Sequence, residues 1–163
     1  MGVRRKGREF ALQMLFQIDM TRQDPQEVVS LFWQGRQVLD EARRHAEALF
    51  RGALEVRPRL DQVLTRVSAH WKLRRMPAVD RNLLRLALYE MLFETDTPRV
   101  VAINEAIEIA KKYGSEDSSQ FVNGVLDRVR EAIVRAEAEG PLAPSALLDR
   151  LLEILPPSAE DAP

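Results

Sequence analysis

Residues 78–94 read AVDRNLLRLALYEMLFE, and this is the most hydrophobic stretch of the chain. Leucine, alanine, methionine and aromatic residues stand on nearly every side of the helix that this segment would form. A helix that is apolar almost all round has to be covered by other elements, so it belongs at the centre of a bundle. The rest of the 163 residues shows helical periodicity and no strand-like alternation between turn residues. We therefore predict an all-α fold built around residues 78–94.

Start and stop signals on either side of this segment predict about seven helices. Asp24-Pro25-Gln26-Glu27 places an N-cap, a first-turn proline and a reciprocal cap in the right order. Asp117 and Gln120 are spaced as a second cap, and Gly114 suits the end of a helix. The expected helices cover about residues 4–20, 25–34, 40–55, 58–71, 78–94, 98–113 and 118–139.

A short basic link at residues 72–77 separates the first four expected helices from the last three. We assign residues 1–72 to an N-terminal helical sub-bundle and residues 73–140 to a C-terminal one. Residues 141–163 form an extra tail, in which residues 145–155 have the pattern of one short amphipathic helix. The predicted architecture is therefore two packed helical sub-bundles followed by a tail.

Composition argues against an enzyme, a metalloprotein and a membrane protein. The chain has no cysteine, and its two histidines, His45 and His70, are isolated from any serine or carboxylate constellation. Its seven glycines form no phosphate-binding loop. No apolar run approaches the roughly 18 residues that cross a bilayer, and polar residues interrupt the N-terminal segment where a signal peptide would be apolar. We predict a cytoplasmic protein with no catalytic residues, metal or cofactor.

The first helix begins with a cluster of cations at Arg4, Arg5, Lys6 and Arg8. Cations at a helix N-terminus face the positive end of the macrodipole, which costs some tenths of a kcal/mol each. A sequence selected for stability alone would place acids there, so the cluster predicts a partner outside the fold, and arginines suit phosphates best. The alternative is a solvated terminus that binds nothing.

Charge is distributed unequally along the chain although the net charge is only −1. Residues 1–75 carry 15 Lys and Arg against 9 Asp and Glu, a net +6, whereas residues 76–163 carry 9 against 16, a net −7. This asymmetry indicates a polyanion on the first half and a basic protein on the second. Asp80, Glu90 and Glu94 are the candidates for meeting that protein, although acids on helices are often only solvated.

Four separated segments together resemble the NusB family of bacterial antitermination factors. In chain order they are RRK-x-RE-x-ALQ-x-LF at 4–16, W-x-L-x-RM-x-x-VDR at 71–81 with LRLA-x-YE at 84–90, VAINEAIE-x-AK at 101–111, and FVNGVLD at 121–127. The last two segments at this spacing are highly specific. The resemblance covers about 130 residues and leaves the tail after Gly140 unexplained.

The resemblance implies a non-catalytic transcription antitermination factor that supports processive elongation by RNA polymerase. It implies binding to boxA RNA of ribosomal RNA operons together with NusE, a small-subunit ribosomal protein, and indirect links to other Nus factors and RNA polymerase. The N-terminal cations match the family's RNA-binding segment. The sequence is compatible with both a monomer and a homodimer.

A second group of candidate RNA contacts lies at the start of the last expected helix: Ser118, Phe121 and Asn123. Free N–H groups at a helix start can hold a phosphate, Phe121 can stack on a base, and Asn123 can read one. Each has an ordinary alternative, because Phe121 falls in the apolar repeat and Asn123 could bond a nearby loop. Gly124 lies inside the helix, where glycine usually marks the close approach of another backbone or a ligand.

Two other functional classes are alternatives to an antitermination factor. Ribosomal RNA cytosine methyltransferases carry a similar helical domain as an RNA-targeting module, but they need a catalytic cysteine and a cofactor-binding domain. A helical adaptor that binds only proteins would leave the arginines solvated. Salt-dependent RNA binding by the isolated chain distinguishes the antitermination factor from the adaptor.

Overall fold

The computed structural model describes residues 2–68 and 71–159, so His70 and the last four residues of the predicted tail lie outside the described residues. Within that range the chain forms eight α-helices and a 3-10 turn, with no strand, which confirms the all-α prediction. The elements are α1 (Val3–Thr21), α2 (Pro25–Trp33), α3 (Asp40–Glu55), α4 (Arg57–Val67), η1 (Leu73–Arg75), α5 (Ala78–Phe93), α6 (Arg99–Tyr113), α7 (Ser118–Ala136) and α8 (Pro144–Ile154).

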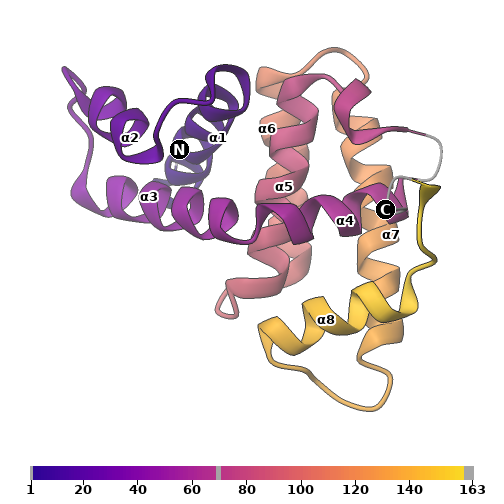
Figure 1. Cartoon of the computed structure of the whole chain (residues 1–163). Coiled ribbons are helices and arrows are strands. Elements are labelled where there is room, and N and C mark those ends of the chain that lie inside the picture. The colour runs from indigo at the N-terminus through magenta and orange to yellow at the C-terminus, as the bar shows by residue number, and fades with distance from the viewer. Residues whose placement is uncertain (1, 69–70, 160–163) are drawn as a thin grey trace.

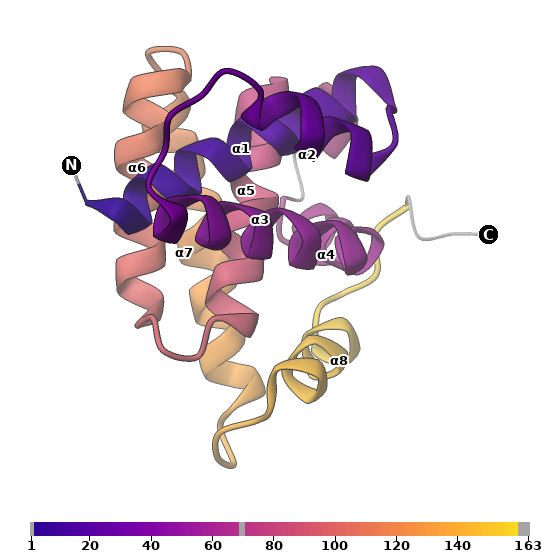
Figure 2. The same ribbon diagram turned by 90° about the vertical axis from the view of Figure 1, so that its left-hand side faces the viewer.

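The helix α5 lies at the centre of the fold, as its hydrophobicity predicts. Figures 1 and 2 show α6 and α7 upright beside it, while α1 and α3 cross it. It also contacts α4 and α8, and its residues Leu84 and Leu88 are fully buried. Because α5 is covered on most sides, even its polar residues Asn82 and Glu90 are buried.

The N-terminal helices pack around a shared apolar surface. The helix α1 packs mainly on α3, and α2 closes over the side of α1 through edge-to-face contacts among Phe10, Phe32 and Trp33. The side chain of Asp24 accepts hydrogen bonds from the N–H groups of Gln26 and Glu27, so the predicted cap of α2 is confirmed.

The predicted side-chain cap of α7 by Asp117 is wrong. Asp117 has helical backbone angles, φ −92° and ψ −6°, and its side chain makes no cap hydrogen bond. An N-cap side chain normally reaches the first turn from an extended backbone. Ser118 ties this corner instead, because its Oγ accepts a 2.9 Å hydrogen bond from the N–H of Ser115.

The amphipathic segment predicted in the tail forms α8, which packs against α4, α5 and α7 (Figure 1). Its buried residues are Leu147, Leu148 and Leu151, followed by Leu155. Glu137 holds the turn before α8 by accepting from the N–H of Leu142 at 2.8 Å and from Arg99 at 2.7 Å. The buried side chains of α1 to α8 form a single hydrophobic cluster. The division into two sub-bundles at residue 72 stays a prediction.

Candidate nucleic-acid interface

Three of the four predicted N-terminal cations, Arg4, Arg5 and Lys6, lie at the surface in the first turns of α1, and the first two of them contact Thr97 and Glu105 around the start of α6. Arg4 is exposed and donates to Thr97 Oγ1 at 3.1 Å, while Arg5 Nε pairs with Glu105 Oε2 at 2.5 Å and keeps 35% of its side chain exposed. Lys6 is also exposed, with its ammonium 5.9 Å from the centre of the Phe10 ring. These weak or surface pairings leave the cations able to exchange partners with phosphates.

Arg8 does not belong to this surface, which corrects its assignment as an RNA contact. Its side chain is 5% exposed and its guanidinium grips the Glu90 carboxylate through contacts of 2.8, 3.0 and 2.5 Å. The helical period places Arg8 in line with Leu12 and Leu15, so it points into the core toward α5. Its partner is 82 residues away in sequence, which is why local patterning did not reveal the pair.

The basic link forms a second cationic surface around an exposed tryptophan. Trp71 is 56% exposed and meets Phe121 edge to face, with ring centres 5.8 Å apart. Phe121 is therefore half-buried, between the two states considered from the sequence. Lys72, Arg74 and Arg75 follow Trp71 directly in the chain, and their side chains are exposed. Unstacked RNA bases are held in this way, by aromatic rings beside cations.

Asn123 and Gly124 lie on the same helix as Phe121. Asn123 is exposed, and a Cβ built on Gly124 would meet nothing nearer than the Arg128 guanidinium at 3.9 Å. No backbone of the described chain approaches Gly124 closely, so the expected close approach of another segment is not found there. The surface of α7 beside Phe121 remains open to a ligand.

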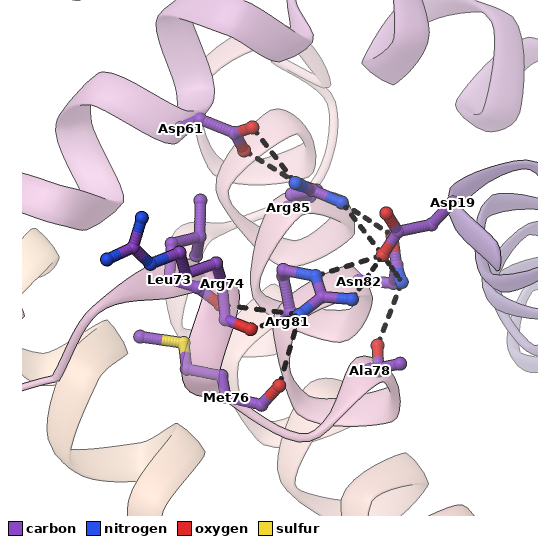
Figure 3. A network of polar contacts seen from close by, with 9 residues as sticks. All are labelled: Asp19, Asp61, Leu73, Arg74, Met76, Ala78, Arg81, Asn82 and Arg85. Carbon is purple, nitrogen blue, oxygen red and sulfur yellow. Dashed lines mark hydrogen bonds and ion pairs between the residues drawn. The ribbon is translucent and has the colours of Figure 1, made fainter. Parts of the chain in front are cut away.

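A partly buried polar network fixes the shape of the basic link (Figure 3). One nitrogen of Arg81 donates to the carbonyl oxygens of Leu73, Arg74 and Met76 at 3.4, 3.5 and 3.1 Å. The other side of the same guanidinium bonds Asp19 at 2.9 and 2.7 Å. Arg81 therefore attaches the link to the end of α1 and positions the cations that the link carries.

Two further side chains complete this network (Figure 3). Arg85 contacts Asp61 at 2.7 and 2.9 Å, and Asn82 donates to Asp19 at 2.9 Å. Burial alone would raise the pKa of Asp19, but the hydrogen bonds from Arg81 and Asn82 outweigh it and hold that pKa below its usual value. Asp19 is therefore an anion that joins α1 to α5.

The structure places Ser118, Asp80 and Glu90 inside the protein, which corrects their predicted roles at the surface. Ser118 is 1% exposed, its hydroxyl donates to Asp80 Oδ1 at 2.6 Å, and its N–H donates to the carbonyl oxygen of Ser115 at 3.1 Å. Ser118 therefore offers no free donor to a phosphate, and Asp80 does not face a docking protein. The Glu90 carboxylate forms an ion pair with the Arg8 guanidinium. These acids lie on α5, whose covered position turns polar groups inward. Glu94 is half-exposed, and its part in docking stays a prediction.

An apolar groove opens between α1 and α2 and extends to the end of α6. Its volume is about 490 Å³, and Phe16, Leu31 and Tyr113 are among the side chains that line it. Phe16 is 37% exposed and Leu31 is 49% exposed, and Met20, in the next turn of α1, is 59% exposed. Clusters of exposed apolar side chains such as this one commonly mark a site where another protein binds.

Two lysines near the end of α6 form ion pairs close to this groove. Lys112 contacts Glu9 at 2.5 Å, and Lys111 pairs with Glu108 at 3.1 Å. The hydroxyl of Tyr113 donates to Glu9 at 2.7 Å. Burial by itself would raise the pKa of Glu9, but the hydrogen bonds from Lys112 and Tyr113 outweigh burial and hold that pKa below its usual value.

Comparison with known proteins identifies the family. The model of the NusB family matches residues 5–131. The chain belongs to the NusB family. A relative from Trichlorobacter lovleyi, named transcription antitermination protein NusB, is 46% identical over 129 residues, which cover 79% of this chain and 91% of the relative. A protein of the same name from Anaeromyxobacter sp. is 50% identical over 127 residues, covering 77% and 88%.

Solved NusB structures share this fold. A T. maritima NusB structure superposes with a TM-score of 0.73 at 41% identity, covering 78% of this chain and 90% of that one. A structure titled as antitermination factors NusB and NusE in complex with dsRNA gives 0.72 at 25% identity, covering 81% and 98%. NusB membership confirms the predicted class, a non-catalytic transcription antitermination factor, and disfavours the methyltransferase-domain and adaptor alternatives.

The surface around Trp71 is the part of the candidate interface that the sequence analysis missed. Trp71 and Arg75 belong to the motif that carries the family resemblance, and Lys72 lies between them, but the sequence analysis assigns none of the three to a site, although a tryptophan in a basic run is itself a signal for nucleic acid. In residues 2–68 and 71–159 no helix is long and apolar enough to span a membrane. Over the same residues, no group of three or more His, Asp or Glu side chains is arranged to hold a metal ion.

Proposed function

We propose that this member of the NusB family binds boxA RNA with two surfaces, the cations at the start of α1 and the basic link around Trp71. The exposed Trp71 within a run of cations carries the proposal, because it combines a stacking platform with charges for the backbone. The helix α6 leads from the Arg4 end to the Phe121 end, and its 15 residues span about 22 Å. An extended RNA strand covers that distance with a few nucleotides.

The two surfaces contribute different kinds of energy. The α1 cations contribute counterion release, worth about −0.7 in the log–log salt slope for each phosphate of a single strand. Stacking on an aromatic ring contributes about 1–3 kcal/mol per base and tolerates any sequence. Asn123, exposed beside the aromatic pair, is the candidate for reading a base edge.

A salt titration of RNA affinity tests the first surface. Arg4→Ala with Arg5→Ala should weaken binding of a boxA RNA and flatten the slope by about 1.4. Arg150→Ala is the matched control, because Arg150 is an exposed arginine on α8 with 49% of its side chain accessible. Wild-type affinity and slope in the double variant would contradict the proposal, and equal losses in the control would reduce it to an effect of net charge.

We also propose that the apolar groove between α1 and α2 docks a NusE-type protein. A similar structure contains NusB with NusE, and this groove gathers exposed Phe16 and Leu31 beside Met20. Phe16→Ala should reduce affinity for NusE without changing RNA affinity in its absence. Leu39→Ala, which truncates another exposed leucine, is the control. Unchanged NusE binding by Phe16→Ala would place the partner elsewhere.

Together the two contacts would tether nascent RNA to elongating RNA polymerase through NusE and other Nus factors. Because RNA and NusE would share one assembly, each should tighten the binding of the other by the same factor. Because a factor bound to nascent RNA acts where the RNA is transcribed, we also propose a cytoplasmic location. Whether the free chain pairs with a second copy is tested by sedimentation at the concentrations used for RNA binding.

A further inference from the structure

A pocket lies between the end of α4, the basic link and the segment that follows α8. Its volume is about 490 Å³, and Trp71 and residues 156–159 form two of its sides. The match to the NusB family model ends at residue 131, so one side of this pocket is built by a part of the chain beyond that match. The other side, formed by Trp71 and the basic link, belongs to the proposed RNA-binding surface.

The chemistry of the lining suits an anionic, planar ligand. Arg66, Lys72 and Arg75 line the pocket together with Trp71, and none of the described lining residues is acidic. Ser68 also lines it and is only 2% exposed, yet among the described residues its hydroxyl has no hydrogen-bond partner. A buried hydroxyl without a partner is costly, so the pocket offers a polar group that a ligand could satisfy.

The segment opposite Trp71 is held in place by the fold. Leu155 is 5% exposed, and Arg66 donates to the carbonyl oxygen of Leu152 at 2.5 Å. Pro156 and Pro157 follow directly, and two consecutive prolines restrict the backbone to an extended form. This side of the pocket is therefore anchored at its start and stiff, so a ligand would lose little affinity to ordering it.

We propose that residues 156–159 and Trp71 form the two walls of a pocket for one unpaired nucleotide of the bound RNA. The base would lie between the Trp71 ring and the proline wall, and its phosphate would face Lys72 and Arg75. The Ser68 hydroxyl would meet a polar edge of the nucleotide. This inference rests on the proposed RNA-binding function and adds to it a contribution from the C-terminal extension.

Substitutions in the two walls test the pocket. Pro156→Gly with Pro157→Gly loosens the proline wall and keeps Leu155 and α8, and it should weaken binding of an unstructured oligoribonucleotide several-fold. Trp71→Ala should weaken it about 5-fold or more, whereas Trp71→Phe should keep most of the affinity because a ring remains. Combining Trp71→Ala with the glycine pair should cost less than the sum of the separate losses, since both walls hold the same nucleotide.

Controls separate the wall from charge and from the fold. Glu160→Gln with Asp161→Asn changes the charge that follows the wall and should not weaken binding. Val134→Ala removes an exposed apolar side chain from the other end of α7 and should leave affinity unchanged. The melting temperatures of all these variants should equal that of the wild-type protein.

The outcomes distinguish this inference from the proposed function. If the wild type binds RNA and the glycine pair binds it equally well, residues 156–159 are not a wall and the inference is overturned. Tighter binding by the glycine pair overturns it too, because the segment would then cover the pocket against RNA. Failure of the wild type to bind RNA at any salt concentration refutes the proposed function and the pocket together.

Discussion

Removing the carboxylate of Glu90 should destabilise the protein severely, because it leaves the Arg8 charge buried without its partner. Arg8 is 4% exposed and Glu90 is 1% exposed, and three nitrogen–oxygen contacts of 2.5–3.0 Å join them. The other acid near Arg8 is Glu105, at 4.0 Å, and Glu105 is already paired with Arg5. The Arg8 guanidinium therefore has no equivalent replacement among the described side chains.

The expected size of the effect is a large part of the total stability. Breaking a buried ion pair by removing one partner costs about 3–5 kcal/mol, against about 5–15 kcal/mol for a whole domain. With about 2–4 °C of melting temperature per kcal/mol in a domain of this size, Glu90→Ala should melt about 6–20 °C below the wild type. Thermal unfolding followed by circular dichroism measures this directly.

A double variant checks that the cost comes from the unpaired charge. Arg8→Met with Glu90→Leu removes both charges and keeps apolar volume, and such replacements are often neutral or stabilising. The double variant should therefore melt well above Glu90→Ala. A melting temperature of Glu90→Ala equal to that of the wild type would refute the internal pair.

The same double variant decides whether Arg8 contacts RNA. Because Arg8 is enclosed by the fold, Arg8→Met with Glu90→Leu should keep the RNA affinity and salt slope of the wild type, whereas Arg4→Ala should not. A slope flattened by about 0.7 in the double variant would mean that Arg8 reaches a phosphate, and the reasoning from burial would be wrong.

Two further predictions concern stability. Leu88 is fully buried in α5, so Leu88→Ala should cost about 2–5 kcal/mol in urea unfolding, whereas an unchanged midpoint would mean that α5 is not central. Burial, with the charges of Arg4 and Arg8, lowers the pKa of His45 from 6.5 to about 4, so the unfolded chain takes up a proton that the folded chain does not. Stability should therefore fall by up to about 2 kcal/mol between pH 7 and pH 5. His45→Gln should flatten this dependence in thermal unfolding at each pH, and an equally steep loss in that variant would assign it to other groups.

The basic link shows how the sequence and the structure divide the account of the RNA-binding surface. Its cations and the tryptophan that precedes it lie within residues 71–75, so they are visible directly in the sequence. Their arrangement depends on Arg81, which gathers three backbone carbonyls of the link and joins them to Asp19, 62 residues away. Such a network leaves no local pattern, because each contact is made between elements that only folding brings together.

By itself, the sequence determined the all-α class, the central place of α5, the cap at Asp24 and the amphipathic segment that became α8. These follow from periodicity and from signals within a few residues, where local sterics and apolar spacing dominate. Only the tertiary structure decided which polar side chains face solvent. Arg8, Glu90, Asp80 and Ser118 all look like surface residues in the sequence. In the structure Arg8 is buried against Glu90, and Ser118 is buried against Asp80. A charged residue on a helix has the same local signal whether it meets water or a partner from a distant helix, and the packing of the helices alone makes that choice.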